Sequence, residues 1–297
     1  MGPIIKKMSI YKNITLILVC FNSEKLIEKN LEKLKKFKTI IIDNSNSKKT
    51  YELINQFTNI NYIAMKENIG YGRAINIGVK STKTQYILIL NPDIIIDIDA
   101  IQILYDKYQI YENIGILAPS LYNQNKIRRT NGSISRLKSN YKNNSSEILP
   151  EFDTCYDYII GCSIFMSTIF FKTIGGFDED FFMYFEDNEI CDRVHKYNRS
   201  VIEIPDAKMV HMQGLSSTKN IFTSIKLSII HKISEYIYYK KNFSRFKLYS
   251  IILKHFLDYL QRSIKNLFLF RFRKFLKNFF RLISIFLFIS NLYRLIY

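Results

Sequence analysis

Three features are scarce in this sequence: long apolar runs, closely spaced cysteines and, towards the C-terminus, acidic residues. The uncharged stretch 282–293 is shorter than the ~20 residues that a helix needs to cross a bilayer. No secretory signal is visible at the start of the chain, so we expect a cytoplasmic protein. The cysteines lack the short pair spacings of metal sites, which predicts reduced thiols. They are Cys20, Cys155, Cys162 and Cys191.

Positive charge is concentrated in the last quarter of the chain. The 297 residues have a formal net charge of +17. Residues 221–297 contain 15 Lys and Arg but two acids, a net +13, which leaves +4 for residues 1–220. We therefore expect two parts, a nearly balanced domain at 1–220, which contains the motifs described below, and a basic amphipathic helical tail at 221–297.

Apolar runs alternate with helix-like segments in the first hundred residues. The runs 14–19, 39–42, 61–65 and 86–90 are expected strands, while 23–37 and 71–80 have helical spacing. Ser23 is a candidate N-cap of the first helix. Strands that are apolar on both faces predict an α/β fold, with a mostly parallel sheet flanked by helices.

Each expected strand is followed by polar or acidic residues. Ligands of such sheets bind beyond the carboxyl ends of the strands, so these residues are candidate site positions. They are Phe21-Asn22, Asp43-Asn44, Glu67-Asn68 and Asn91-Pro92-Asp93.

The second half contains a polar stretch, a cluster of acids and a late histidine. Residues 123–150 lack periodicity and are expected to form a mobile surface loop, with a lid as one function. Residues 175–187 join two glycines, several aromatic residues and a dense set of carboxylates, which suits chemistry in a partly dry pocket. Residues 201–204 and 208–210 are expected to be two short strands that lead to His211.

Four blocks of this sequence resemble family-2 glycosyltransferases, in particular their rhamnosyltransferase-like members. Their order and spacing extend the resemblance over roughly residues 14–217. The blocks are Cys20-Phe21-Asn22-Ser23, residues 67–78, Asn91-Pro92-Asp93 and residues 175–193, with a weaker fifth block at His211, Gly214 and Ser216.

The resemblance implies a GT-A (Rossmann-like) fold, an inverting sugar transfer and a divalent metal, Mg or Mn. Asn91-Pro92-Asp93 takes the place of the family's Asp-x-Asp turn. Asp93 is the candidate metal ligand, because a hard cation neutralises the departing diphosphate. Asn91 is expected to bind the ribose or the metal's water shell. A Pro-Asp turn that caps the next helix is the alternative.

The same resemblance makes Asp187 the candidate general base, which accepts the proton of the acceptor hydroxyl. Glu186 competes for this role, or contacts the acceptor. The alternative is a solvated helix face paired with Arg193 or Lys196. The family usually has Asp where this chain has Glu189.

The remaining candidates concern the nucleotide and the metal. Asp43 matches a position that contacts the nucleotide base, with an Asx-turn carboxylate as the alternative. His211 resembles a histidine that completes the metal's coordination, although a structural histidine is the alternative. Phe21 stands where the family often has Tyr. The expected nucleotide-binding residues are Phe21, Asn22, Asp43, Asn68, Gly70, Arg73 and Asn91.

The tail shows apolar residues at steps of three and four, opposite a basic face. This pattern favours a helix at an anionic membrane surface. A nucleic-acid-binding helix and a helix packed on the catalytic domain are the alternatives. The apolar residues are Phe268, Phe272, Phe275, Phe279, Leu282, Phe286, Ile289 and Tyr293.

Together these features predict an inverting glycosyltransferase on the inner face of the cell membrane. It would move a sugar from a nucleoside diphosphate to a polysaccharide or lipid-linked glycan. A sugar nucleotidyltransferase should have a basic, glycine-rich signature after its first strand, and Phe21-Asn22-Ser23-Glu24 is not one. A basic nucleic-acid-binding protein should have its charge near the motifs, which are nearly neutral here.

Overall fold

The computed structural model describes residues 9–129, 131–133, 149–212 and 220–295. The chain divides into two compact units. The first unit comprises Met1–Asp178 and Glu186–Ser216, and the second comprises Ser217–Tyr297 together with the short segment Glu179–Phe185. The second unit therefore includes residues that directly precede the expected catalytic acids.

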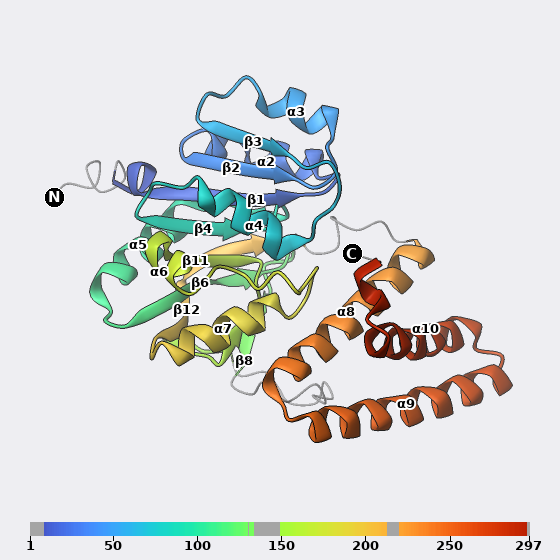
Figure 1. The fold of residues 1–297 in the computed structure, drawn as a ribbon. Helices are drawn as coiled ribbons and strands as arrows, with labels where there is room; N and C mark the ends of the chain where they lie inside the picture. The colour runs from blue at the N-terminus through green and yellow to red at the C-terminus, as the bar shows by residue number, and fades with distance from the viewer. Residues whose placement is uncertain (1–8, 130, 134–148, 213–219, 296–297) are drawn as a thin grey trace. The chain divides into compact units, whose positions relative to one another are not determined.

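The first unit is built on a mixed sheet, which Figure 1 shows from one side. Its main strand order is β3-β2-β1-β4-β11-β6-β12-β5. The first four strands of this order are parallel, and β6 pairs in parallel with β12, whereas β11 is antiparallel to both β4 and β6. The bounds are β1 Ile14–Cys20, β2 Lys38–Asp43, β3 Ile60–Ala64, β4 Tyr86–Leu90, β5 Ile94–Ile95, β6 Ile114–Tyr122, β11 Ser163–Ser167 and β12 Ser200–His211.

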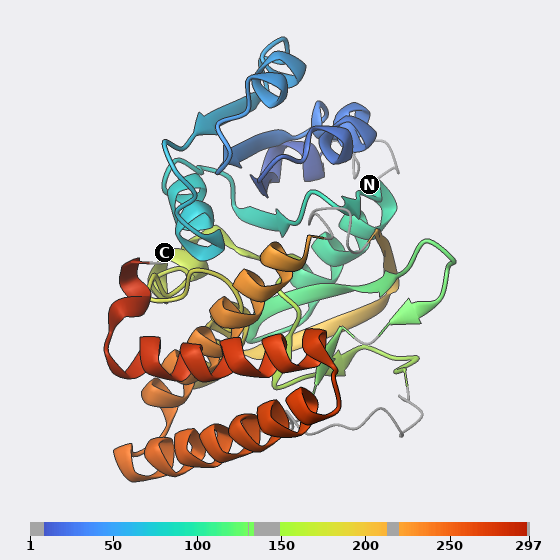
Figure 2. The ribbon, with the colours of Figure 1, turned by 90° about the vertical axis from the view of Figure 1, so that its right-hand side faces the viewer.

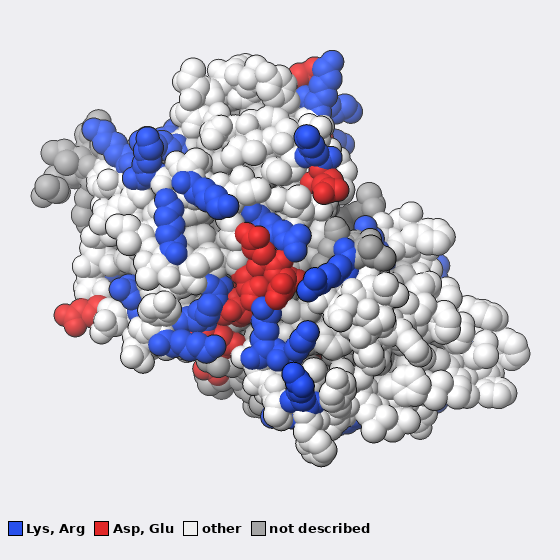
Figure 3. All heavy atoms as spheres, viewed as in Figure 1, with Lys and Arg blue, Asp and Glu red and all other residues white. Residues whose placement is uncertain are grey.

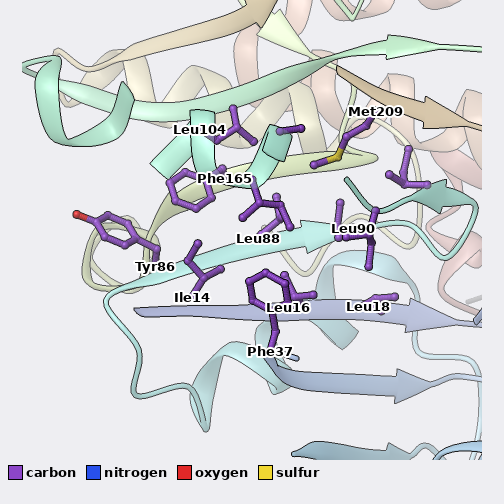
Figure 4. Close-up of a cluster of buried hydrophobic side chains, with 14 of the residues drawn as sticks. Ile14, Leu16, Leu18, Phe37, Tyr86, Leu88, Leu90, Leu104, Phe165 and Met209 are labelled. Carbon is purple, nitrogen blue, oxygen red and sulfur yellow. The ribbon is translucent and has the colours of Figure 1, made fainter. Parts of the chain in front are cut away.

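Alternate residues of the central strands enter two different apolar clusters. In β1, Leu16 and Leu18 belong to one cluster, while Ile17 and Val19 belong to the other. Figure 4 shows part of the first cluster, where Leu88 of β4 lies near Leu16. Successive strand side chains point to opposite faces, so a strand covered on both faces must be apolar at every position.

Helices bury both faces of the sheet. Residues of α2 and α5 contribute to the first apolar cluster, and residues of α4, α6 and α7 contribute to the second. The described structure thus has the expected arrangement of a mostly parallel sheet between helical layers. The helices are α2 Glu24–Leu34, α3 Lys48–Ile54, α4 Tyr71–Lys80, α5 Ile98–Ile110, α6 Thr168–Thr173 and α7 Glu186–Lys196.

One expectation about the later segments was wrong, and another concerns residues that are only partly described. The two short strands expected at 201–204 and 208–210 are one strand, β12, with a shift in its pairing to β6 between Ile204 and Lys208. Pro205 lies in this shift, where its missing N–H interrupts no ladder. Of the expected surface loop, residues 134–148 lie outside the described residues. Short strands occupy β7 Arg128–Arg129, β8 Gly132–Ser133, β9 Thr154–Cys155 and β10 Tyr158–Ile159.

The second unit is a helical bundle, seen from another side in Figure 2. It contains α8 Ile221–Asn242, α9 Arg245–Phe268 and α10 Phe272–Ile289, followed by the 3-10 helix η1 Leu292–Leu295. Its apolar core includes Ile233 and Tyr236 of α8 together with Phe288 of α10. α10 packs against both α8 and α9.

The apolar stripe expected along 268–293 does not form a single helix face. α9 ends at Phe268, Phe270 adopts a left-handed backbone with φ of 52°, and α10 begins at Phe272. α10 buries Ile285 and Phe288, which are not part of that stripe. Phe272 and Phe286, which are part of it, are 58% and 68% exposed.

No described helix combines the length and the apolar composition that spanning a membrane requires.

Candidate active site

Asp93 lies in the turn that follows β4 and is almost completely buried. The turn begins where the Asn91 N–H donates to the Cys162 carbonyl at 2.9 Å, which joins it to the start of β11. Asp93 is 4% exposed, and its Oδ2 lies 3.3 Å from Nε2 of His211 at the end of β12. Its Oδ1 has no hydrogen-bond partner among the described residues. A buried carboxylate oxygen without a partner is costly, which suggests that a ligand completes it.

Asp93 in this turn and His211 at the end of β12 are the candidate ligands of a metal ion. No group of three or more His, Cys, Asp or Glu suited to a metal occurs among the described residues. Two protein ligands are sufficient for a cation that takes its other ligands from water and phosphate oxygens. The buried, incompletely bonded carboxylate of Asp93 fits such a cation.

Glu186 and Asp187 begin α7 and occupy different environments. Oδ2 of Asp187 accepts the Gly161 N–H at 2.9 Å, and its Oδ1 accepts the Asn188 N–H at 2.9 Å. Glu186 is 6% exposed, and its Oε2 has no hydrogen-bond partner among the described residues. Two backbone donors thus orient the Asp187 carboxylate, whereas Glu186 is buried with one carboxyl oxygen that has no partner among the described residues.

Gly161 and Tyr71 complete the surroundings of Asp187, and the sequence reasoning missed both as site residues. The Tyr71 hydroxyl donates to the Gly161 carbonyl at 3.0 Å, opposite the Gly161 N–H that binds Asp187. A Cβ at Gly161 would lie 2.9 Å from the Cβ of Asp187. An isolated glycine in an apolar run is a known signal of close approach, and Gly161 lies in such a run.

Electrostatic effects connect the β4 turn with the acid pair. Burial raises the pKa of the Cys162 thiol, and the carboxylates of Asp93 and Asp187 raise it further. Burial also raises the pKa of Tyr71, with further contributions from Glu186, Asp187 and Asp93. The Asn91 N–H bonds the Cys162 carbonyl and the Gly161 N–H bonds Asp187, so two consecutive residues before β11 connect the Asp93 turn with the acid pair.

The two acids of the pair are expected to differ in protonation at neutral pH. Burial, followed by the charge of Asp187, raises the pKa of Glu186 to about 8. Burial also raises the pKa of Asp187, but backbone hydrogen bonds from Gly161 and Asn188 oppose this effect. Glu186 is therefore protonated at neutral pH while Asp187 retains donors that stabilise its charged form.

The alternative of a solvated helix face paired with Arg193 or Lys196 is met only in its pairing, because Glu189 is buried. Glu189 forms an ion pair with Arg193, with Oε2 2.6 Å from Nη2. Arg193 also donates to the Ile174 carbonyl. Glu186 and Asp187 lie one turn earlier and accept none of these bonds.

The glycine turn before the acid cluster is fixed to α4. Asn76 of α4 accepts the Phe177 N–H and donates to the Phe177 carbonyl, both at 2.8 Å. Gly176 has φ of 71°, and a Cβ there would lie 2.5 Å from Oδ1 of Asn76. Only glycine allows both this backbone and this approach.

Asp43 has no acceptor position open to a ligand. Its Oδ1 accepts both the N–H and the hydroxyl of Ser45, and its Oδ2 accepts the Ser47 N–H and the Tyr62 hydroxyl. The side chain is completely buried. This geometry favours the Asx-turn alternative over a direct contact with the nucleotide base.

The other expected nucleotide-binding residues lie around the carboxyl ends of β1 and β3 and the start of α4. Phe21 is 48% exposed, and the Asn22 N–H donates to Oγ of Ser45 at 3.0 Å. The Gly70 N–H donates to Oδ1 of Asn68 at 3.0 Å, with φ of 91° at Gly70. Arg73 is half-buried in the first turn of α4.

Two known enzymes of glycan synthesis are similar to this chain in sequence. A hexosyltransferase of low-salt glycan biosynthesis from Haloferax volcanii, Agl10, is 25% identical over 70% of this chain and 69% of its own length. A poly-beta-1,6-N-acetyl-D-glucosamine synthase of Staphylococcus aureus is 29% identical over 39% of this chain, which matches 31% of the synthase.

Among solved structures, a mannosyltransferase from Pyrobaculum calidifontis in complex with GDP-Man and Mn²⁺ is similar, with a TM-score of 0.53 and 12% identity. The similarity covers 77% of this chain and 64% of that protein. Residues 1–349 of TarS from S. aureus have a TM-score of 0.51 and 14% identity, and the similarity covers 75% of this chain and 65% of that fragment. These likenesses support the GT-A fold.

The family model described as "Glycosyl transferase family 2" matches residues 15–172. This match includes the β4 turn with Asp93 and ends before the acid pair of α7. It confirms the family that the sequence blocks indicated: the chain belongs to glycosyl transferase family 2 and is a glycosyltransferase.

Proposed function

We propose that this glycosyltransferase moves a sugar from a nucleoside diphosphate to a glycan or lipid-linked acceptor, with inversion at the anomeric carbon. The observation that supports it most is the single site formed by buried Asp93 and by Glu186 and Asp187. An in-line displacement of the diphosphate needs a group that binds the leaving diphosphate and a base for the acceptor hydroxyl. Asp93 and Asp187 are the candidates for these two roles. The roles of the Haloferax and Staphylococcus relatives in glycan synthesis suggest the acceptor class.

Asp93 and His211 would hold a divalent cation, Mg²⁺ or Mn²⁺. A cation bound there neutralises the charge that develops on the leaving diphosphate. The incompletely bonded Oδ1 of Asp93 and the nearby Nε2 of His211 support this assignment. Mn²⁺ accompanies the nucleotide sugar in the Pyrobaculum enzyme.

Asp187 would act as the general base. Its two backbone hydrogen bonds orient the carboxylate, and it would accept the proton of the acceptor hydroxyl as that oxygen attacks the sugar. Glu186 would be the neutral neighbour of the base. Its raised pKa keeps it protonated at neutral pH, so no second negative charge lies beside Asp187. Single-displacement attack from the face opposite the diphosphate gives inversion.

The nucleotide would lie along the carboxyl ends of β1 and β2 and the start of α4. Phe21 offers an exposed ring, while Asn22, Asn68, Asn91 and Arg73 offer polar contacts. Gly70 would allow close approach of the backbone. Asp43 would act indirectly, by fixing the loop after β2 through its bonds to Ser45 and Ser47.

The C-terminal helices would bind the anionic inner face of the cell membrane. α9 exposes apolar side chains at helical spacing, among them Leu253 at 59%, Leu257 at 55% and Ile264 at 49%. Lys247, Lys254 and Lys265 share another side of the same helix. Residues 245–294 contain eleven Lys and Arg and one acid. Apolar side chains flanked by basic ones suit a headgroup region that contains anionic lipid.

The direct test is release of nucleoside diphosphate from a panel of UDP- and GDP-sugars in the presence of Mn²⁺ or Mg²⁺ and lipid extracts that supply acceptors. We expect release with at least one donor, dependent on acceptor and metal. Formation of a sugar nucleotide from a sugar phosphate and a nucleoside triphosphate, with no transfer from any donor, would instead indicate a nucleotidyltransferase.

A further inference from the structure

Two consecutive aromatic residues directly before the acid pair have a left-handed backbone. Tyr184 has φ of 71° and Phe185 has φ of 66°. Residues with a bulky side chain rarely adopt this conformation, because their Cβ approaches the following carbonyl. Such residues persist where the surrounding structure holds them, and they cluster at functional sites.

Helix α8 provides the contacts that hold these two residues. The hydroxyl of Ser234 donates to the Met183 carbonyl at 2.8 Å, and the Ser234 side chain is completely buried. The ring of His231 lies 5.2 Å from the ring of Tyr184 and 5.4 Å from that of Phe185, between centroids. The strained backbone is therefore fixed by a hydrogen bond on one side and by ring packing on the other.

The beginning of the same segment is also bound to α8. Lys241 forms an ion pair with Asp180 at 2.6 Å, and Phe181 is completely buried in the core that contains Ile233 and Tyr236. The whole segment Glu179–Phe185 thus belongs to the C-terminal unit.

The segment continues through a peptide bond into Glu186, the first residue of α7. We propose that α8 positions the acid pair through the chain itself, with Ser234 and His231 as positioning residues that hold Tyr184 and Phe185 in the backbone conformation that leads into Glu186. The C-terminal unit then serves the chemical step as well as any surface that it binds. This inference rests on the proposed role of Asp187 as the base.

The test compares Ser234→Ala with Ser224→Ala, an exposed serine of the same helix whose hydroxyl bonds its own helix backbone. A displaced base costs rate, because a misplacement of about 1 Å can reduce rate by about 10²-fold. We expect Ser234→Ala to lower kcat about tenfold or more. The KM for the donor and the affinity for UDP or GDP should not change, and Ser224→Ala should resemble the wild type.

His231 provides a second, independent variant pair. His231→Ala removes the ring and should lower kcat, and it should also move the acid limb of the kcat–pH profile as the environment of the acid pair relaxes. His231→Phe keeps the ring and should restore most of the kcat.

Wild-type kcat in both Ser234→Ala and His231→Ala would overturn the inference. Equal losses of kcat and of nucleoside diphosphate affinity would also overturn it, because they indicate a general loss of structure. Asp187→Asn, measured alongside, separates this failure from failure of the proposed function. Transfer by that variant would remove the base role itself, whereas its inactivity beside unchanged α8 variants would remove only the positioning role.

Discussion

At the scale of single residues, the site depends on two adjacent carboxyl groups with opposite preferences. Asp187 receives two backbone N–H groups, which stabilise a carboxylate. Glu186 has an oxygen without a hydrogen-bond partner among the described residues, and burial raises its pKa to about 8. Within the acid pair, two oriented donors therefore favour the charged form of Asp187, while burial favours the neutral form of Glu186.

Asp187→Asn should abolish transfer and leave the fold and nucleotide affinity intact, because the amide cannot accept the proton of the acceptor hydroxyl. General-base catalysis typically contributes ~10²–10⁴-fold, so at least this loss is expected. Nucleoside diphosphate release measures it, with Asp206→Asn as the control, since Asp206 is exposed on β12. Comparable activity in the two variants would move the base role to another residue.

Glu186→Gln should flatten the pH dependence of stability. Glu186 retains its proton in the folded state up to a pKa of about 8, but loses it near 4.5 when unfolded. Its contribution to stability is therefore fully present below pH 4.5 and is lost as pH rises through about 8. Chemical denaturation between pH 4 and about 9 should show a smaller decline for the variant than for the wild type. Parallel curves would contradict the raised pKa.

The sequence allowed some of these residues to be predicted and not others. Asp93 and Asp187 could be selected as candidates because each lies in a block whose residue pattern is specific, and their roles stay predictions. The sequence could not show that donors within the protein occupy the acceptor positions of the Asp43 carboxylate. One of these donors is the hydroxyl of Tyr62, which approaches Asp43 only when β3 pairs with β2. The role of Gly161 likewise depends on how β11 approaches α7 in the folded chain.

At the scale of elements, the site is assembled where β4, β11 and α7 meet. The end of β4 presents Asp93, and the residues just before β11 provide the Gly161 N–H that binds Asp187. β11 pairs with β4 from Ser163 opposite Leu90 onward, so the register of these two strands sets the spacing of the site. A small change in the approach to β11 should therefore affect chemistry more than folding.

Gly161→Ala should reduce kcat by about 10-fold or more, because the new Cβ would lie 2.9 Å from the Cβ of Asp187 and displace it. Tyr71→Phe, which removes only the hydroxyl that binds the Gly161 carbonyl, should reduce kcat less. Steady-state kinetics with thermal melting measures both. A Gly161→Ala enzyme with wild-type kcat would exclude an effect on catalysis of the close packing between this backbone and Asp187.

Elements with a strong local pattern were predicted almost to their bounds. The expected helix 71–80 and strand 86–90 match α4 and β4. The bounds and buried faces of the C-terminal helices were not predicted. These helices are apolar on more than one side, so periodicity alone cannot identify which side is buried. In α10, Ile285 and Phe288 face the bundle while Phe286 between them is exposed.

At the scale of the whole molecule, the exposed apolar residues are concentrated on the C-terminal helices. On the side shown in Figure 3, few charged side chains lie over α9 and α10. Isolated exposed apolar residues are common, but a continuous stripe on one helix indicates an interaction surface. The basic residues of these helices make an anionic bilayer the partner that we propose.

The triple substitution Leu253→Ser, Leu257→Ser and Ile264→Ser should release the protein from anionic vesicles. Losing roughly 1 kcal/mol of apolar transfer at each position weakens partitioning about a hundredfold. Sedimentation with phosphatidylglycerol vesicles measures this. Ile110→Ser with Ile169→Ser is the control, since these side chains are 72% and 73% exposed in the catalytic unit. Equal sedimentation of the triple variant and the wild type would exclude α9 as the bound face.

The central claim is that Asp93 holds a cation for the donor's diphosphate while Asp187 faces the acceptor. Calorimetric binding of UDP and GDP, with and without Mn²⁺, to the wild type, Asp93→Ala and Asp187→Asn tests it most directly. We expect metal-dependent binding by the wild type and by Asp187→Asn, and at least about a tenfold loss in Asp93→Ala. Equally tight binding by Asp93→Ala, or binding by the wild type that does not depend on metal, would contradict the account.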